Sequence, residues 1–218
     1  MSSETKRVYI AATRQNDGKT IVSLGLFAAL RKRFKKIGYI KPVGQHYLMV
    51  DGKKIDKDAV LINQVYQPAG ALVDSSPVAV PHGFTEAYIR HGKKEVLARR
   101  IKRSFRNIQK ESDFVLIEGT GHAGVGSVFD LSNAEVASQL RAKVIIVSIG
   151  GIGKPIDEIM LNKAMFDQKG VEILGVIINK VYEKKMNKIA RLVKAGLARK
   201  KIELLGVIPF RESLSSPT

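Results

Sequence analysis

The chain has 218 residues, of which 44% are hydrophobic and 26% are charged, a balance typical of one globular domain. It contains no cysteine, which excludes disulfides, thiol nucleophiles and cysteine-based metal sites. No apolar run reaches the roughly 18 residues that a membrane span needs. No signal or transit peptide is visible before the first predicted strand, so we expect a cytoplasmic protein with no membrane partner.

The net charge is strongly positive. Lys and Arg number 37 against 20 Asp and Glu, which gives +17. This excess favours either a nucleic-acid partner or a lysine-rich solvated surface that also attracts phosphorylated metabolites. The basic residues are spread over several helical segments, and aromatic residues, which stack on bases, make up only 6%. We favour the solvated surface and leave a nucleic-acid partner open.

Short apolar runs alternate with helical periodicity along the first half of the chain. The expected elements, in order, are a strand at 7–13, a helix at 19–35, a strand at 37–43, a helix at 55–65, an irregular stretch with three prolines at 67–84, a helix at 86–109 and a strand at 114–117 that ends at Glu118.

The second half continues the alternation. The expected elements are a glycine-rich loop at 119–126, a helix at 132–140 with Ser132 or Asn133 as its N-cap, a strand at 143–149, a helix at 157–167, a strand at 171–179, a helix at 183–200 and a strand at 204–208. Continuous Val/Ile runs between helices predict a three-layer α/β fold, with a mostly parallel sheet covered by helices on both faces. We assign residues 1–211 to this domain and residues 212–218 to a linker-like tail.

The segment ATRQNDGKT at 12–20 joins the first strand to the first helix, which is the position of a P-loop. Free N–H groups and the positive end of the helix dipole attract phosphate there, and Gly18 lets the backbone come close. Lys19 would bridge the β- and γ-phosphates of ATP, and the Thr20 hydroxyl would bind Mg²⁺. A polar turn between strand and helix, without a ligand, is the alternative.

Three further loop positions are candidate nucleotide contacts. The first glycine of a standard P-loop is absent, and Thr13 stands near its place. Asn16 lies in the middle of the loop. Arg14 lies five residues before Lys19, where some P-loop ATPases carry a lysine that reaches the nucleotide of a dimer partner. Its planar fork suits phosphate oxygens, but a solvent-facing loop charge is an equal alternative.

With G-K-T after the first strand, K-P-V at 41–43 and I-E-G at 117–119, the chain resembles dethiobiotin synthetase. More broadly it is similar to the family that includes the ATPase domain of cobyrinic acid a,c-diamide synthase. It looks most similar to the dethiobiotin-synthetase-like domain at the N-terminus of some phosphate acetyltransferases. The resemblance covers residues 8–210. It implies a P-loop NTPase fold, ATP and Mg²⁺ as cofactors, an anionic small-molecule substrate and a homodimer.

The resemblance also implies roles for single residues. Lys41 matches a lysine that holds the γ-phosphate and substrate, Asp58 an aspartate that binds Mg²⁺, and Glu118 an acidic residue that serves the metal. Asn179 matches an asparagine that reads adenine, and Pro209 belongs to a segment, 206–209, that wraps the adenine. The implied catalytic set is Lys19, Lys41 and Glu118, and the implied metal set is Thr20, Asp58 and Glu118.

Elementary chemistry is consistent with these assignments. Ligands of α/β proteins bind at the carboxyl ends of parallel strands, where Lys41, Glu118 and Asn179 are expected. Mg²⁺ prefers hard oxygen ligands such as hydroxyl and carboxylate groups. The structural alternatives are a surface lysine at 41, a helix N-terminal acid at Asp58 or at Asp56, and a strand-end turn residue at 179.

The match to dethiobiotin synthetase fails where its acyl substrate would sit. Gly44-Gln45-His46 stands where that enzyme carries a substrate-binding serine, and the loop at 119–126 is longer and richer in glycine. The loop could cradle an anion, act as a lid or contact a second copy. His122 within it is either a proton carrier, a phosphate contact or a polar surface residue.

Three functions are compatible with these observations. The first is an enzyme in which ATP phosphorylates a carboxylate or carbamate before an amine attacks. The second is a nucleotide-sensing module that controls a dimer or an attached enzyme. The third is a partition-type ATPase that binds DNA through its basic surface; its charge and Arg14 favour it, and the K-P-V and I-E-G motifs disfavour it.

Overall fold

The computed structural model describes residues 5–214. Residues 1–4 and residues 215–218 of the expected tail lie outside this part. The described strands form a six-stranded sheet in the order β10-β9-β8-β1-β7-β2, and every neighbouring pair is parallel. Its strands are β1 (Lys6–Ala12), β2 (Ile37–Ile40), β7 (Phe114–Glu118), β8 (Lys143–Ile149), β9 (Ile173–Val181) and β10 (Leu204–Pro209).

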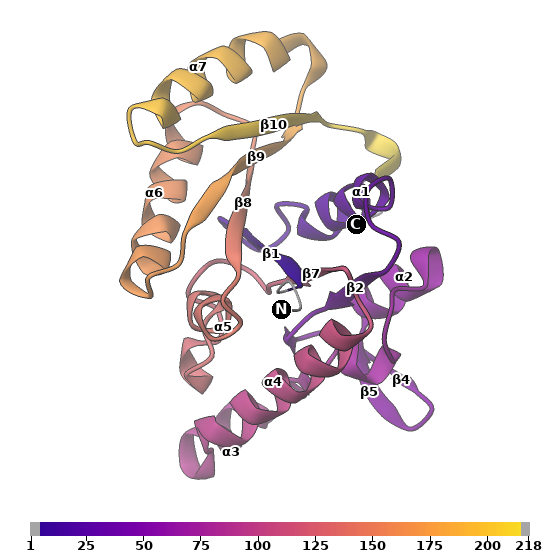
Figure 1. Ribbon diagram of the computed structural model, residues 1–218. Helices are drawn as coiled ribbons and strands as arrows, with labels where there is room; N and C mark the ends of the chain where they lie inside the picture. The colour runs from indigo at the N-terminus through magenta and orange to yellow at the C-terminus, as the bar shows by residue number, and fades with distance from the viewer. Residues whose placement is uncertain (1–4, 215–218) are drawn as a thin grey trace.

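Helices cover both faces of this sheet (Figure 1). Along β1, Val8, Ile10 and Ala12 belong to one hydrophobic core, and Tyr9 and Ala11 belong to the other, because successive side chains of a strand point to opposite faces. The first core includes α1 (Lys19–Leu30) and α2 (Lys57–Tyr66), and the second includes α4 (Lys94–Lys110), α5 (Asn133–Gln139), α6 (Gly153–Gln168) and α7 (Met186–Ala198). The predicted three-layer α/β fold is therefore confirmed.

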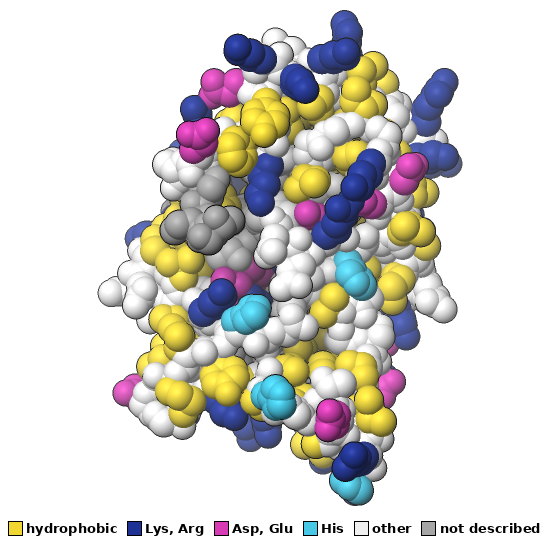
Figure 2. Space-filling view, turned by 180° about the vertical axis from the view of Figure 1, so that it is seen from behind, with side chains coloured by type: hydrophobic (Ala, Val, Ile, Leu, Met, Phe, Trp, Pro, Cys, Tyr) yellow, Lys and Arg dark blue, Asp and Glu magenta, His cyan; other side chains and the backbone are white. Residues whose placement is uncertain are grey.

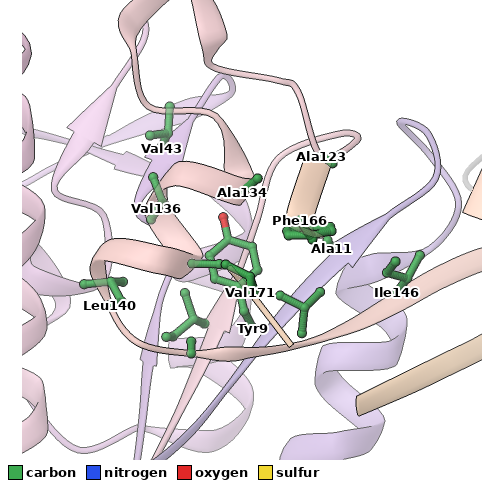
Figure 3. Close-up of a cluster of buried hydrophobic side chains, with 14 of the residues drawn as sticks. Tyr9, Ala11, Val43, Ala123, Ala134, Val136, Leu140, Ile146, Phe166 and Val171 are labelled. Atoms are coloured by element: carbon green, nitrogen blue, oxygen red, sulfur yellow. The ribbon is translucent and has the colours of Figure 1, made fainter. Parts of the chain in front are cut away.

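Tyr9 lies in the middle of the second core (Figure 3). It is 1% exposed, and burial of a large apolar side chain of this kind contributes about 1.5–3 kcal/mol. Its hydroxyl points toward α5 and donates to Asn133 Oδ1 at 2.7 Å. The buried phenol thus ties β1 to the first residue of α5 without leaving a polar atom unpaired.

One predicted helix is two helices in the structure. The expected helix at 86–109 divides into α3 (Phe84–His91) and α4, and Gly92 between them is extended, with φ −68° and ψ 149°. A Cβ at position 92 would lie 2.3 Å from a ring atom of Tyr88, so the turn requires glycine. The periodicity continues across the break, which is why the pattern alone indicated one helix.

A hairpin was missed in the segment before α2. Strands β4 (Tyr47–Val50) and β5 (Lys53–Asp56) pair antiparallel around Asp51-Gly52, which have φ of 49° and 72°. Asp-Gly with both residues left-handed is a preferred hairpin turn. The helix expected at 55–65 therefore starts at Lys57, and Asp56 is its N-cap.

The other differences are short. A two-stranded parallel pair, β3 (Val43–Gly44) with β6 (Val78–Ala79), and a 3-10 turn at Leu72–Ser75 occupy stretches expected to be irregular or at a strand end. The first helix ends at Leu30 instead of residue 35, and α6 begins at Gly153 instead of 157. Among residues 5–214, the structure has no helix long and apolar enough to cross a membrane.

Candidate functional site

The turn between β1 and α1 holds its shape through its own carboxylate. Asp17 Oδ2 accepts hydrogen bonds from Thr13 Oγ1 at 2.6 Å and from the Arg14 backbone N–H at 2.8 Å. Asn16 and Gly18 have positive φ, 66° and 94°. Gly18 is the N-cap of α1, and no side chain caps this helix. The first N–H groups of α1 therefore have no side-chain acceptor, as an anion-binding helix start requires.

Residues of β9 hold this turn from the side. Asn179 Nδ2 donates to the Asp17 carbonyl at 2.9 Å, and Lys180 Nζ donates to the Asn16 carbonyl at 2.8 Å. A Cβ at Gly18 would lie 2.1 Å from Asn179 Nδ2, which leaves glycine as the residue that fits. Asn179 is buried and lies within β9 rather than at its end. Its amide is therefore tied to the turn itself.

Burial sets the pKa of two charged groups at this turn. It raises the pKa of Asp17 above the usual value, against the opposing hydrogen bond from Thr13. It lowers the pKa of Lys19, which is 8% exposed, and the nearby Glu118 carboxylate partly opposes that shift. A desolvated ammonium at a helix start attracts an anion more strongly than a hydrated one.

Glu118, at the end of β7, faces the start of α1. Its Oε1 accepts from Thr20 Oγ1 at 3.0 Å, and its Oε2 accepts from the Tyr39 hydroxyl at 3.0 Å. Glu118 is 0% exposed, and burial raises the pKa of its carboxyl group, with the charge of Lys41 opposing the shift. Tyr39 was not among the predicted site residues, because the pattern of a buried strand predicts that its tyrosine belongs to the hydrophobic core.

Lys41 follows β2 and lies between two carboxylates. Its Nζ is 3.1 Å from Asp56 Oδ1 and also forms an ion pair with Asp58. Burial acts to lower the pKa of Lys41, but the charges of Glu118 and these two aspartates outweigh it and raise the pKa to about 12. Lys41 is 7% exposed, so the surface-lysine alternative is wrong.

Both aspartates near the start of α2 have structural partners. Asp56 Oδ1 accepts from the Asp58 backbone N–H at 2.9 Å, which caps the helix. The sequence left Asp56 as a helix N-terminal acid and assigned Asp58 to Mg²⁺. In the structure the Asp58 carboxylate pairs with Lys41, and its role at a metal stays a prediction.

The oxygens of Thr20 and Glu118 fit a hard cation. They are 3.0 Å apart, and both are ligand types that Mg²⁺ accepts. Within residues 5–214 no group of three or more His, Asp or Glu side chains is placed to hold a metal ion. A cation here would accordingly depend on one hydroxyl, one carboxylate and the phosphates of a ligand, the usual mode for Mg²⁺ in nucleotide sites.

The glycine-rich loop at 119–126 is held by amide side chains. Asn133 Oδ1 accepts from the Thr120 backbone N–H at 3.1 Å, and Asn133 Nδ2 donates to the carbonyls of Thr120 and His122. The Ala123 N–H donates to Asn162 Oδ1 at 2.7 Å. These N–H groups are therefore used within the protein, which favours a fixed turn over an anion cradle. His122 is exposed, and its Nδ1 accepts from the Gly124 N–H at 3.1 Å.

We expect Asn133→Ala to lower the free energy of unfolding by about 3 kcal/mol. The change removes the hydrogen bonds to the loop and leaves the buried Tyr9 hydroxyl without its acceptor. Urea unfolding followed by circular dichroism measures the loss. Asn187→Ala, at an exposed position of α7, is the matched control and should change stability by less than about 0.5 kcal/mol. Equal losses in both variants would contradict the role given to Asn133.

The remaining predicted residues lie at the edges of the site. Arg14 pairs with Glu158 of α6 through Nε–Oε2 at 2.9 Å and a second guanidinium contact, so it is not an unpaired loop charge. Pro209 is the last residue of β10, and the segment 206–209 is strand rather than loop. The contact of either residue with a nucleotide stays a prediction.

The site forms where three neighbouring strands end. The turn follows β1, Glu118 ends β7, and Lys41 follows β2; these strands are adjacent in the sheet. A parallel α/β sheet whose first strand leads through a glycine turn and a buried lysine into a helix defines the P-loop NTPase fold.

The comparison with protein families gives the same class. A family model described as "AAA domain" matches residues 6–218, and the chain belongs to this AAA domain family of P-loop ATPases. It is 27% identical over 184 residues to a phosphate acetyltransferase of Synechocystis sp., covering 81% of this chain and 25% of that protein. It is 29% identical over 197 residues to the ATP-dependent dethiobiotin synthetase of Clostridium kluyveri, covering 82% and 76%. The resemblance inferred from the motifs is confirmed.

The two kinds of relative differ in how much of their length this chain covers. The chain spans only 25% to 30% of the phosphate acetyltransferases from Synechocystis sp. and Nitratidesulfovibrio vulgaris.

Solved structures agree on the fold. A Borrelia burgdorferi protein described as a plasmid partition protein, bound to AMPPNP, has a TM-score of 0.57 at 15% identity and covers 99% of this chain and 91% of that one. The MinC:MinD complex of Aquifex aeolicus gives 0.58 at 15%, covering 96% and 83%.

Proposed function

We propose that the chain binds ATP with Mg²⁺ at residues 13–20 and transfers the γ-phosphoryl group to a carboxylate or carbamate oxygen. The observation that carries this proposal is the convergence of Lys19, Lys41 and Glu118 from three adjacent strands. Burying a charge is costly unless it serves a pair or a ligand. Lys41 has Asp56 and Asp58 as partners, whereas Lys19, next to the helix start, forms no salt bridge within residues 5–214, which favours a ligand at Lys19.

Each residue has a task in this reaction. The first N–H groups of α1 and Lys19 Nζ bind the β- and γ-phosphates, and Lys41, fixed by Asp56 and Asp58, supplies a second positive charge. Thr20 and Glu118 would hold Mg²⁺, which neutralises phosphate oxygens when bound. As the acceptor oxygen bonds to the γ-phosphorus, the bond to the ADP oxygen breaks, and preorganised positive charge stabilises the transition state.

The relatives support ATP as the phosphoryl donor, but they do not identify the acceptor. The dethiobiotin synthetase of C. kluyveri is ATP-dependent by name, and the chain covers 76% of it. The residues at 44–46 differ from the serine that this family uses for its substrate, so we assign the acceptor by class alone. An exclusively nucleotide-sensing module is the second candidate, because the matched stretch makes up only 25% to 30% of the phosphate acetyltransferase relatives.

We expect Glu118→Gln to reduce Mg²⁺-dependent turnover of ATP about 100-fold or more, since the neutral amide cannot serve the metal as a carboxylate does. ADP release in the presence of ATP, Mg²⁺, bicarbonate and diaminopelargonic acid measures the effect. Glu172→Gln, at an exposed position before β9, is the control and should retain full activity. Turnover that needs the amine substrate supports the ligase, whereas tight ATP binding without turnover in the unmodified protein favours the sensing module.

Two expectations from the sequence become proposals here. We propose residues 1–211 as the folded domain and residues 212–218 as a linker-like tail. We also propose a homodimer in which Arg14 approaches the nucleotide of the partner subunit. This requires the Arg14–Glu158 ion pair to open, in which the Arg14 side chain is 40% exposed and the Glu158 side chain 18%.

A further inference from the structure

Helix α4 carries more exposed basic residues without a salt-bridge partner than any other described helix. Its last twelve residues, 99–110, contain no Asp or Glu. They contain six exposed basic residues, namely Arg99, Arg100, Lys102, Arg103, Arg106 and Lys110. Within residues 5–214, none of the six forms a salt bridge with a carboxylate. The proposed ATP site accounts for none of this charge.

The charges are arranged in line along the helix. Arg99, Arg103, Arg106 and Lys110 follow one another at spacings of four, three and four residues, which places them on one stripe. The stripe is about 16 Å long at 1.5 Å per residue. Like charges at these spacings repel and destabilise a helix that stands alone. A partner with a row of negative charges would remove this repulsion.

The opposite side of α4 is committed to the core. Leu97, Ala98, Ile101, Phe105 and Ile108 are buried against the sheet, so the helix has no free apolar face. A helix that inserts between lipid headgroups needs such a face. The buried face therefore disfavours insertion into a membrane and favours a polyanion recognised by charge.

The guanidinium groups are suited to phosphate. Arg99 Nε and Arg106 Nε donate to the carbonyls of Glu95 and Lys102, one turn earlier in the same helix. These bonds hold the side chains along the helix while their terminal N–H groups remain available for a phosphodiester. One strand of B-form DNA presents a phosphate every 3.4 Å or so along its axis, about five over the length of the stripe.

We propose that the exposed face of α4 binds the phosphate backbone of double-stranded DNA without reading its sequence. The face carries no exposed aromatic side chain in 99–110, which disfavours single strands, where bases stack on aromatic rings. A helix fits the wide major groove of B-form DNA, whereas the major groove of A-form RNA is too narrow for side chains to enter. DNA is therefore the favoured duplex.

This surface lies apart from the proposed ATP site. Helix α4 leads directly into the start of β7, so Lys110 is near the amino end of that strand and Glu118 is at its carboxyl end (Figure 1). We therefore expect the Lys19→Ala protein to bind DNA as the unmodified protein does. Failure of DNA binding and failure of ATP binding are then separate results.

The α7 region offers a matched control. Lys and Arg side chains also gather at the upper end of the face in Figure 2, where Figure 1 shows α7. Within this helix the exposed cations are Lys188, Arg191 and Lys194. Replacing these three by Gln removes the same charge as replacing three arginines of α4. Net charge alone would make the two triple variants equivalent.

Fluorescence anisotropy with a random-sequence DNA duplex tests the proposal. With about six phosphate contacts, we expect affinity to fall roughly 1,000-fold between about 50 and 200 mM salt. Replacing Arg99, Arg103 and Arg106 by Gln should weaken binding about 100-fold or more near 100 mM salt and reduce the logarithmic salt slope by about 3. The α7 triple variant should keep most of the affinity. Thermal unfolding confirms that both variants are folded.

Four outcomes would overturn the proposal. They are the absence of DNA binding at low salt, equal losses in the two triple variants, tighter binding to double-stranded RNA than to DNA, and binding to phosphatidylserine vesicles that exceeds binding to DNA and depends on the same arginines.

Discussion

Lys19→Ala is expected to weaken ATP binding about 100-fold or more. In the proposed site the Lys19 ammonium makes charged hydrogen bonds to two phosphates, and each such bond is worth about 1.5–3 kcal/mol. Lys19 is 8% exposed, so water cannot easily take its place. Isothermal titration calorimetry of the Mg²⁺–ATP complex measures the loss.

A second lysine separates the local effect from a change in net charge. Lys143 is exposed at the start of β8, at the amino ends of the parallel strands and away from the carboxyl ends where the proposed site lies, and Lys143→Ala should bind ATP as tightly as the unmodified protein. Both variants should unfold cooperatively, since removing Lys19 takes away a charge that burial already disfavours. Unchanged ATP affinity in Lys19→Ala would contradict the phosphate site.

Lys41→Met is expected to reduce the free energy of unfolding by about 3–5 kcal/mol at neutral pH. The thioether fills a similar volume, so the loss comes from the charge. Asp56 and Glu118, which are 1% and 0% exposed, would each lose the ammonium that faces them, and an uncompensated buried charge is strongly destabilising. Guanidinium unfolding of the two proteins gives the difference.

The pH dependence of this difference follows from the pKa of Lys41. The folded protein raises that pKa from 10.5 to about 12, so the protonated amine is favoured in the folded state. The stabilisation it gives is fully present below pH 10.5 and is lost as the pH rises through about 12. The stability difference between Lys41→Met and the unmodified protein should therefore shrink above pH 10.5. A difference independent of pH there would contradict the role of Lys41 as a buried ion-pair partner.

The alternation of strand and helix was predictable because parallel strands buried on both faces must be continuous Val/Ile runs. The strand at 143–149 was predicted with both ends correct, and the N-cap of α5 is Ser132, whose side chain accepts from the Glu135 N–H. The predicted element bounds were wrong where a turn divides a segment whose hydrophobic pattern does not show the break. Gly92 breaks a helix whose periodicity resumes, and Asp51-Gly52 turns a hairpin in a segment with weak alternation.

The residues of the candidate site that directly follow or end a strand could be predicted from the sequence. Lys19, Lys41 and Glu118 all follow or end strands of one sheet, so topology alone brings them together. Their partners were not predictable in the same way. Tyr39 belongs to no spaced motif and acts through a contact across the fold, and Asp17, although it lies within the segment 12–20, acts through hydrogen bonds inside the turn. The pairing of Asp58 with Lys41 joins residues on the two sides of the β4–β5 hairpin, which no local pattern predicts.

A crystal structure grown with AMPPNP and Mg²⁺ is the most direct test of the proposed site. The account predicts the triphosphate against the backbone N–H groups of Gly18, Lys19 and Thr20, with Lys19 Nζ beside it and the cation next to Thr20 and Glu118. A triphosphate bound elsewhere, with this turn free of ligand, would contradict it.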